Sequence, residues 1–334
     1  MATSTQGDLQ RGCPREHPTI EVDQGATETD STYGDELSQY TASLTSSAFE
    51  YREENGRTYH TYKDGSYFFP NDETESNRMN MKHEAALAML DGKLFVAPVK
   101  DPRYILDIGT GTGVWAMDVA DQFPEAEVTG IDLSPTQSVL VPPNLKFIVD
   151  DMEEEWLFKE KFDLIHARYL VGALADPAQV IAQAYKQTAP GGWLEWHEMN
   201  TKVLSPDGTH EGTFIARFFD VLRDSFSKRG RSMDSSLSLE KWFQEAGFVD
   251  VTVKKIPVPV GTWPKDHVLK RIGLWMYLTL DAGYEGLAMA VLTRFENWAP
   301  EEVTVLAAKA RKDSKDPNIH AMFNDYLVYG RRPE

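Results

Sequence analysis

Short apolar runs alternate with helical periodicities over the middle of the chain. Runs typical of buried strands lie at 104–108, 127–131, 145–149 and 162–166. Between the first two runs, apolar residues recur with the i, i+3, i+4, i+7 spacing of one helix face, at Ala116, Val119, Ala120 and Phe123. Because strands that alternate with helices favour a parallel sheet, the pattern predicts an α/β fold.

The alternation continues beyond residue 175. Asp176 followed by Pro177 is typical of a helix start, because aspartate caps the first turn and proline fits its first position. The stretch "PGGWLEWHEM" then predicts a turn and a fifth strand. The elements expected after it are an amphipathic helix over 214–226, a helix near 236–246 and a strand near 249–255.

The stretch 257–320 departs from this alternation. Its apolar residues follow helical spacing twice, first within 268–276 and then within 287–295. A final strand is predicted at 326–330. We therefore expect 257–320 to be a helical insertion between the last two strands, placed so that it covers a ligand site.

The first hundred residues differ in composition from the rest. Residues 1–35 are rich in Thr, Ser, Gly, Asp and Glu and poor in large apolar side chains, which predicts a disordered acidic tail. Aromatic residues return between 51 and 73, so we expect residues 36–100 to form an N-terminal cap that acts as a substrate lid. The sheet and its insertion then form one domain over 101–334.

Composition and charge narrow the class of protein. With 41% hydrophobic residues among 334, the chain can bury a substantial core. A net charge of −18 argues against binding a phosphate backbone, and no apolar run is long enough to span a membrane. The single cysteine, Cys13, excludes internal disulfides and cysteine-based zinc clusters. We expect a cytoplasmic protein that binds no nucleic acid, no membrane and no metal.

The loop "DIGTGTG" at 107–113 is the strongest chemical signal. A loop that binds nucleoside triphosphates has a lysine followed by Ser or Thr after its glycines, but Val114 and Trp115 stand there. A dinucleotide loop has the spacing G-x-G-x-x-G, whereas the third glycine here comes one position early. The pattern D-x-G-x-G-x-G instead predicts binding of S-adenosylmethionine (SAM), because alternate glycines let the backbone approach the methionine moiety.

Further polar signals lie at predicted strand ends, where open α/β sheets bind their ligands. Asp132 ends the second strand, and its carboxylate is expected to accept both ribose hydroxyls. The third strand ends in 150–152, where a carboxylate and an apolar side chain can bracket adenine. The fourth ends in 166–168, facing the methionine portion. The expected cofactor-binding residues are Asp107, Gly109, Thr110, Gly111, Gly113, Trp115, Asp132, Leu133, Asp150, Asp151, Met152, His166 and Arg168.

Several stretches carry a resemblance to a known family. "LDIGTGTGVWAMDVADQFPEAEVTGIDLSPTQ" contains the glycine loop and Asp132, and "VPPNLKFIVDDMEEEW", "FDLIHARYL" and "AQAYKQTAPGGWLE" contain the signals that follow. Further matches are "FPNDETESNRMNMKHEAAL", "GTWPKDHVLKRIG" and "RKDSKDPNIHAMFNDYLVYGRRP". Over roughly residues 60–334 the sequence resembles class I SAM-dependent methyltransferases, and within that class the fungal LaeA-like family.

The resemblance implies a seven-stranded Rossmann-like methyltransferase sheet with the last strand antiparallel. It also implies SAM as the cofactor, held at the glycine loop, at Asp132 and at the ends of the third and fourth strands. Members of the LaeA-like family act in nuclear complexes that control secondary metabolism. A regulatory role would therefore bring protein partners and a nuclear location.

Catalytic residues are harder to read from the sequence. Methyl transfer from SAM is an in-line displacement, so the enzyme contributes mainly proximity and alignment, and a base is needed only when the acceptor must lose a proton. His197 and Glu198 end the fifth strand and His166 ends the fourth, so each is a candidate to face the methyl group. For His197, a hydrogen-bonded place in the core is the alternative interpretation.

Candidate substrate contacts are Tyr67 and Arg78 in the cap and Trp275 in the insertion. Arg78 either clamps an acidic substrate or pairs with a nearby carboxylate, and Trp275 either lines an apolar pocket or packs within the lid. We expect methyl transfer to a small molecule, at an oxygen (hydroxyl or carboxylate) of a fungal secondary metabolite. The alternatives are a LaeA-like regulatory methyltransferase in a nuclear complex, and a methyltransferase fold that catalyses a non-methylating step.

Overall fold

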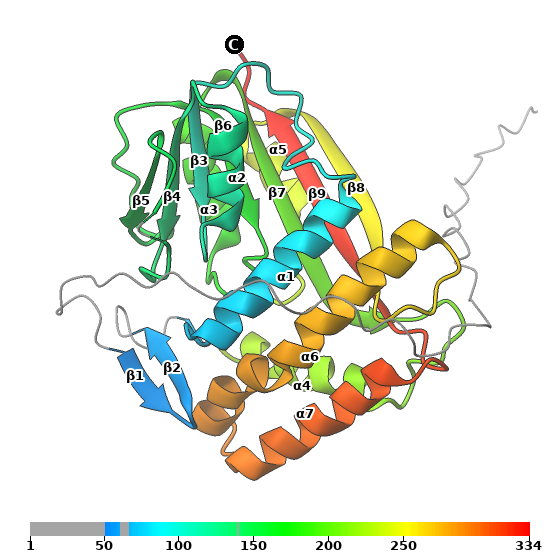
Figure 1. The fold of residues 1–334 in the computed structure, drawn as a ribbon. Helices are drawn as coiled ribbons and strands as arrows, with labels where there is room; N and C mark the ends of the chain where they lie inside the picture. Colours follow the sequence, from blue (N-terminus) through cyan, green and yellow to red (C-terminus); the bar gives the residue numbers. More distant parts are fainter. Residues whose placement is uncertain (1–50, 61–66, 139) are drawn as a thin grey trace, which may run out of the picture.

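The computed structural model describes residues 51–60, 67–138 and 140–334 (Figure 1). The expected disordered tail at 1–35 lies outside these described residues, as do residues 36–50 of the expected cap. Among the helices that the structure describes, none has the length and apolar character that crossing a membrane requires.

A seven-stranded sheet lies at the centre of the molecule (Figure 1). Its strands are β3 (Tyr104–Ile108), β4 (Glu127–Asp132), β5 (Leu145–Val149), β6 (Phe162–Arg168), β7 (Thr188–Leu204), β8 (Val249–Pro259) and β9 (Met322–Arg331). They are ordered β5-β4-β3-β6-β7-β9-β8, with β3 to β7 parallel and β9 antiparallel between β7 and β8. The predicted Rossmann-like sheet with an antiparallel last strand is confirmed.

The inner strands are apolar on both faces because helices cover both sides of a parallel sheet. In β3 the side chains of Ile105, Leu106 and Ile108 are all fully buried. Strands β7 and β9 are longer than their apolar runs predict, since they continue to pair through polar positions such as Asn200 with Asn324. Backbone pairing with a neighbour therefore extends both strands beyond the segment that periodicity identifies.

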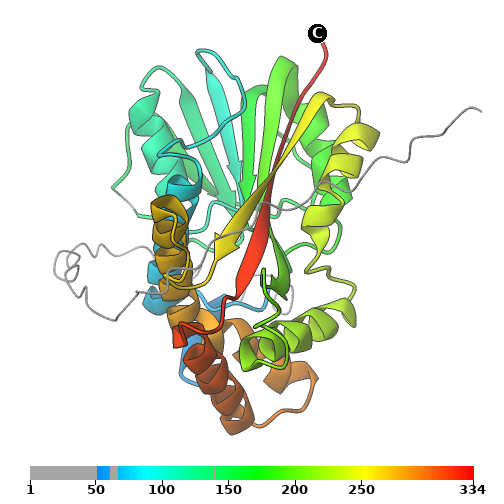
Figure 2. The same ribbon diagram turned by 90° about the vertical axis from the view of Figure 1, so that its right-hand side faces the viewer.

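The helices form two groups, shown in Figures 1 and 2. The first group packs on the sheet faces and comprises α2 (Val114–Gln122), α3 (Pro177–Gln187), a 3-10 turn (Ser235–Leu237) and α5 (Leu239–Ala246). The second gathers around the end of the sheet toward which β4 and β5 point, and comprises α1 (Glu73–Met89), α4 (Phe214–Ser227), α6 (His267–Phe295) and α7 (Pro300–Lys315). A hairpin of β1 (Tyr51–Glu54) and β2 (Arg57–His60) lies beside this second group.

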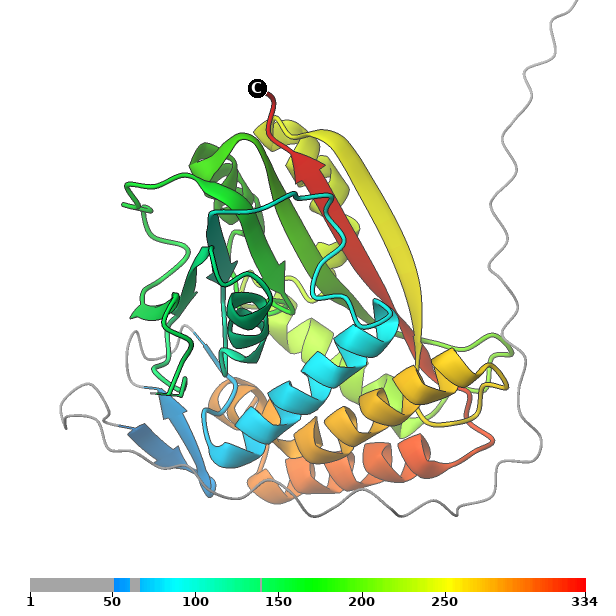
Figure 3. The same ribbon diagram turned by 45° about the horizontal axis from the view of Figure 1, so that its top comes forward.

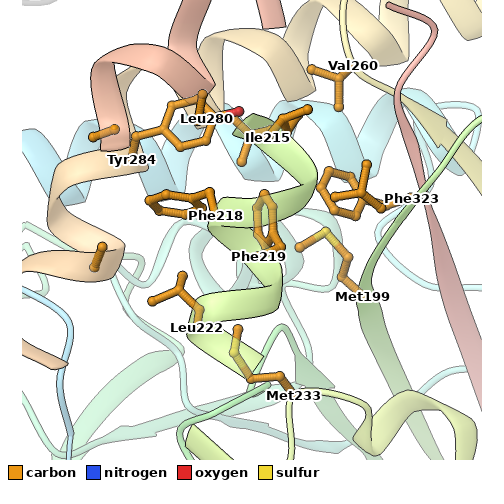
Figure 4. Close-up of a cluster of buried hydrophobic side chains, with 14 of the residues drawn as sticks. Met199, Ile215, Phe218, Phe219, Leu222, Met233, Val260, Leu280, Tyr284 and Phe323 are labelled. Carbon is orange, nitrogen blue, oxygen red and sulfur yellow. The ribbon is translucent and has the colours of Figure 1, made fainter. Parts of the chain in front are cut away.

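Helices α6 and α7 are the predicted insertion between the last two strands, and in Figure 3 α6 lies between α1 and α7. Helix α4 supplies the centre of the core beneath them (Figure 4). Its apolar residues share one face, which includes the buried side chains of Phe218 and Phe219. Phe218 meets the ring of Tyr284 from α6 edge-on at 4.9 Å between centroids. Aromatic packing thus joins the insertion to the end of the sheet.

Two glycines let the cap approach the insertion closely. A Cβ atom at Gly283 of α6 would lie 2.6 Å from Cδ of Arg78, and one at Gly286 would lie 2.7 Å from Nη1 of Arg57. Arg78 also forms an ion pair with the buried carboxylate of Glu75, at 2.6 Å between Nη2 and Oε1. The arginines of the cap therefore occupy the space that these two glycines leave in α6.

A buried carboxylate fastens the segment after α1 to the sheet. Glu195 of β7 is fully buried, and its Oε2 accepts hydrogen bonds from the backbone N–H groups of Val96 (2.8 Å) and Ala97 (2.6 Å). Burial raises the pKa of Glu195 to about 7, against the effect of these two hydrogen bonds. The folded protein therefore holds this proton more tightly than the unfolded chain.

The raised pKa of Glu195 has a measurable consequence for stability. Its stabilising contribution is complete below the unfolded pKa of about 4 and is lost as the pH rises through about 7. Between about pH 4 and pH 7 the unfolding free energy of the wild type should therefore decrease. In Glu195→Gln this decrease should be smaller by on the order of 2 kcal/mol. Urea unfolding across this pH range measures it, with the exposed Glu127→Gln as control. An unchanged pH slope in Glu195→Gln would contradict the assignment.

Candidate functional site

The glycine loop connects β3 to α2 in a conformation that only glycine adopts without strain. Gly109, Gly111 and Gly113 have φ values of +67°, +60° and +81°. There is also no room for a side chain: a Cβ atom at Gly113 would lie 2.3 Å from Cζ of Phe147, and one at Gly109 would lie 2.3 Å from Cδ2 of Leu170. Gly113 is therefore needed for the conformation of the turn, while Gly109 and Gly111 line the cleft above the strand ends.

Asp132 closes the loop from the end of β4. Its Oδ2 accepts the backbone N–H of Gly111 at 2.8 Å, and its Oδ1 accepts that of Ser134 at 2.9 Å. Burial raises the pKa of Asp132 to about 6, which these hydrogen bonds oppose. Each carboxylate oxygen keeps further acceptor capacity toward the cleft, which Asp132 lines together with Leu133. This arrangement suits a ligand with two adjacent hydroxyl groups.

Behind the loop, four side chains form a connected unit. Asp107 accepts hydrogen bonds from Nδ1 of His166 at 2.7 Å and from the hydroxyl of Thr110 at 2.6 Å. The His166 ring stacks on Trp115 with centroids 3.6 Å apart, and Trp115 donates its Nε1–H to the backbone oxygen of Leu94 at 2.8 Å. Burial lowers the pKa of His166 to about 4, so the ring is neutral at pH 7.

Arg168 reaches the same cleft from the end of β6. Its Nη2 donates to Nδ1 of His83 at 2.8 Å, and Nε2 of His83 contacts Oδ2 of Asp118 at 2.9 Å. Because arginine can only donate, His83 is unprotonated at Nδ1 and carries its proton toward Asp118. Arg168 therefore pairs with a neutral imidazole and keeps its positive charge available to the cleft.

The segment after β5 forms the opposite wall. Asp151 and the buried Met152 line the cleft together with Glu153. The side chain of Asp150 is exposed and accepts the backbone N–H of Asp151 at 2.8 Å, so it belongs to the turn and not to the cleft wall. Of the acidic run that the sequence singled out, the structure brings Asp151 and Met152 to the cleft and leaves Asp150 outside it.

The structure does not bring two of the candidate catalytic residues to the cleft. His197 and Glu198 of β7 are both about 1% exposed and do not line it. His197 lies 3.1 Å from Asp325 of β9, measured between Nε2 and Oδ2, and tilts against the ring of Tyr169. Tyr169 lies on the cleft wall and separates this pair from the ligand space. The alternative interpretation of His197, a residue of the core, agrees with this placement.

Beyond the glycine loop the cleft has an apolar compartment. Its walls come from α4, α6, β7 and the loop before α5, through Met199, Phe219, Leu222, Met233, Met276 and Leu280. Figure 4 labels all of these residues except Met276. Tyr67 and Arg78 of the cap also line the cleft, although Arg78 is paired with Glu75. Trp275 does not line it and contributes to a separate surface hollow with Glu84.

Comparison with known proteins agrees with this geometry. A profile of the methyltransferase domain matches residues 81–253. Methyltransferase pytC of Aspergillus terreus is 40% identical over 318 residues, covering 94% of this chain and 95% of that relative. Secondary metabolism regulator LAE1 of Cochliobolus heterostrophus is 36% identical over 291 residues, covering 84% and 94%. Protein-methionine methyltransferase laeA of Emericella nidulans is 31% identical over 288 residues, covering 85% and 77%.

Solved structures align less closely. Haemonchus contortus phosphoethanolamine N-methyltransferase 2, in complex with S-adenosyl-L-methionine, has a TM-score of 0.47 and 16% identity, covering 85% of this chain and 71% of that chain.

The fold and the family match define the class of this protein, which is a SAM-dependent methyltransferase with a Rossmann-like sheet. The chain belongs to the methyltransferase-domain family, and within it to the fungal group of secondary metabolism that includes pytC and the LaeA-like regulators. SAM is its cofactor and supplies an electrophilic methyl group on a sulfonium. The residues present fit this group, because the cleft offers a strand-end carboxylate at Asp132 beside a close-approach loop at Gly109–Gly111.

Several cleft residues were not among the sequence-based candidates, and two of them bear on the chemistry of the site. Lys82 of α1 and Tyr169, which follows β6, both line the cleft. In the sequence Lys82 is one charged residue among many in a polar helix, and its i, i+3 spacing to Met79 on one helix face is the only local signal. Tyr169 follows Arg168 directly, and its left-handed backbone (φ +58°) is visible only in the structure.

Proposed function

We propose that this methyltransferase transfers the methyl group of SAM to an oxygen of a small molecule of fungal secondary metabolism. The apolar compartment carries this proposal. It adjoins the glycine loop, and its walls come from helices of the insertion and from the sheet, as in sites that enclose small ligands. The match to methyltransferase pytC over 94% of the chain supports the same class of role.

We place the cofactor along the strand ends. In this proposal the ribose hydroxyls bind Asp132, adenine packs between Leu133 and Met152 with Asp151 at its edge, and the methionine carboxylate faces Arg168. The support is that all these side chains line one cleft. The residues of the expected cap that the structure describes would act as the substrate lid, because α1 contacts both the loop and α6.

We assign His166 a positioning role. Efficient general bases have a pKa near the working pH, whereas the pKa of His166 is lowered to about 4. Its bond to Asp107 and its stacking on Trp115 support a role in holding the cofactor wall in place. The transfer then depends on alignment of the acceptor with the methyl group, which can supply a large part of the rate enhancement.

Regulation is the second candidate function, favoured by one observation. Two of the relatives, at 36% and 31% identity, are a secondary metabolism regulator and a protein-methionine methyltransferase. A regulatory enzyme would methylate a protein, whereas the first proposal requires a small acceptor.

Methyl-labelled SAM separates the two functions. The protein is incubated with it and with either the small-molecule extract or the protein fraction of a fungal culture that expresses this chain. We expect label in the organic extract, in a product heavier than its precursor by one CH2 unit, with heat-inactivated protein as control. Label confined to the protein fraction would overturn the small-molecule proposal in favour of the regulatory one. Failure of the protein to bind SAM would remove the basis of both.

A further inference from the structure

The ammonium group of Lys82 lies on the cleft wall without a directly bound partner. Its Nζ stands 3.8 Å above the centroid of the Tyr169 ring, an attractive cation–π arrangement. Among the residues that the structure describes, it forms no hydrogen bond and no ion pair within 4 Å. Burial lowers the pKa of Lys82, since water that would solvate the charge is largely removed. Its three N–H donors are therefore available to a ligand.

Two buried carboxylates, those of Asp325 and Glu198, lie near Lys82 and favour its charged form, although neither forms an ion pair with it within 4 Å. Asp325 on β9 accepts the hydroxyl of Tyr169 at 2.9 Å. Glu198 on β7 accepts the backbone N–H of Met199 at 3.1 Å, and burial raises its pKa. The other two cations on this wall differ from Lys82: Arg78 forms two hydrogen bonds to Glu75, of 2.8 and 2.6 Å, and Arg168 is bonded to His83.

Tyr169 fixes where this ammonium stands relative to the two parts of the cleft. The residue directly follows β6, whose end faces the cofactor site, and its ring packs against the apolar cluster that includes Met199 and Phe219. Its backbone has φ +58°, which is unfavourable for a bulky residue and persists only where the surroundings impose it. The hydrogen bond from its N–H to the oxygen of His197 (2.9 Å) and the one from its hydroxyl to Asp325 supply that constraint.

We propose that Lys82, held over Tyr169, binds the acceptor through a negatively charged oxygen, either a carboxylate or an ionised enol. This proposal rests on the proposed function and names the acceptor class of that same site. An apolar acceptor body fills the compartment of Met199, Phe219, Leu222, Met233, Met276 and Leu280. Its oxyanion is the one part that needs a cation. Lys82 can supply it, because its donors form no hydrogen bond within the described part of the chain, whereas Arg168 is assigned to the methionine carboxylate in the proposed complex.

The chemistry balances without a protein base. A lone pair of the acceptor oxyanion forms the new O–C bond to the methyl carbon, while the C–S bond breaks and its electron pair stays on sulfur. The acceptor loses its negative charge and the sulfonium its positive charge, so no proton is released. An ionised acceptor therefore explains why neither His197 nor Glu198 needs to reach the cleft.

Binding of matched anionic and neutral probes tests the proposal. The probes are 2-naphthoate with 2-naphthamide, and 4-hydroxycoumarin (an ionised enol at neutral pH) with coumarin. Their affinities are measured by calorimetry for the full chain saturated with S-adenosylhomocysteine. The variants are Lys82→Met, Lys82→Arg and, as matched control, Lys93→Met, whose lysine is exposed near the end of α1. Thermal unfolding and S-adenosylhomocysteine affinity show whether each variant retains its fold and its cofactor site.

We expect the wild type to bind at least one anion better than its neutral partner. Lys82→Met should lose about tenfold or more of that affinity. Lys82→Arg, which keeps the charge but not the shape, should lose less than Lys82→Met, and Lys93→Met should keep the affinity within about threefold. S-adenosylhomocysteine affinity should stay unchanged in all variants. The proposal is overturned if the wild type binds neither anion better than its neutral partner, or if Lys82→Met binds the anions as the wild type does. If the wild type does not bind S-adenosylhomocysteine, the cofactor site on which the proposed function rests is refuted instead.

Discussion

Replacing Asp132 with alanine should weaken SAM binding by about 100-fold or more. In the proposed complex the carboxylate accepts two ribose hydroxyls, and hydrogen bonds to a charged group contribute about 1.5–3 kcal/mol each. Two of them correspond to at least about 3 kcal/mol, which is roughly two decades in the dissociation constant. The carboxylate also orders the loop by accepting the N–H of Gly111, so its removal loosens the cofactor site as well.

Calorimetric titration with SAM and with S-adenosylhomocysteine measures this effect. Asp132→Asn should fall between the wild type and Asp132→Ala, because the amide keeps one acceptor oxygen but no charge. Asp121→Ala is the matched control, since that carboxylate is exposed on α2. If Asp132→Ala binds SAM within about threefold of the wild type and unfolds at the same temperature, the ribose contact lies elsewhere.

Replacing Phe219 with alanine should lower the unfolding free energy by about 3–5 kcal/mol. The ring is 2% exposed and packs edge-on against Phe323, with centroids 4.8 Å apart, and against Phe218 at 5.3 Å. Figure 4 shows these rings at the centre of the cluster around α4. The neighbours come from a helix and a strand that cannot collapse freely, so most of the volume of the lost ring remains as a cavity.

Chemical denaturation with one probe in the sheet and one in the insertion measures this loss. Leu157→Ala, at a side chain that is 83% exposed, should change stability by less than about 0.5 kcal/mol. Because Phe219 lines the apolar compartment and not the glycine loop, SAM affinity should be retained in the folded variant. A loss below about 1 kcal/mol would show that α4 does not form part of the cooperative core.

The sequence predicted the sheet and the cofactor loop well because both are encoded locally. The run at 104–108 coincides with β3, and the three alternating glycines coincide with three left-handed backbone positions. Strand ends could also be located, and Asp132 and Met152, which follow two of them, both line the cleft. The lengths of β7 and β9 were underestimated because their outer halves are polar and are held by pairing with each other.

Side-chain direction at the acceptor end could not be predicted in the same way. His197 and Glu198 end an apolar run, which suggested a place at the cleft, yet β7 continues past them and neither side chain lines the cleft. In α6 the pattern pointed to Trp275, whereas Met276 lines the cleft. Whether a residue faces the ligand depends on how helices from distant segments pack, and periodicity assigns only a broad face.

By itself, the sequence determined the fold class, the cofactor and the position of the glycine loop at which we place it. These depend on spacings within a few residues and on backbone conformations that only glycine adopts easily. The tertiary structure decided which charges meet at the cleft. His83 and Arg168 are bonded although they are 85 positions apart, and Lys82 stands over the ring of Tyr169 with no hydrogen-bond partner among the residues that the structure describes. Such neighbours arise when α1 packs across the strand ends, and no local pattern records that packing.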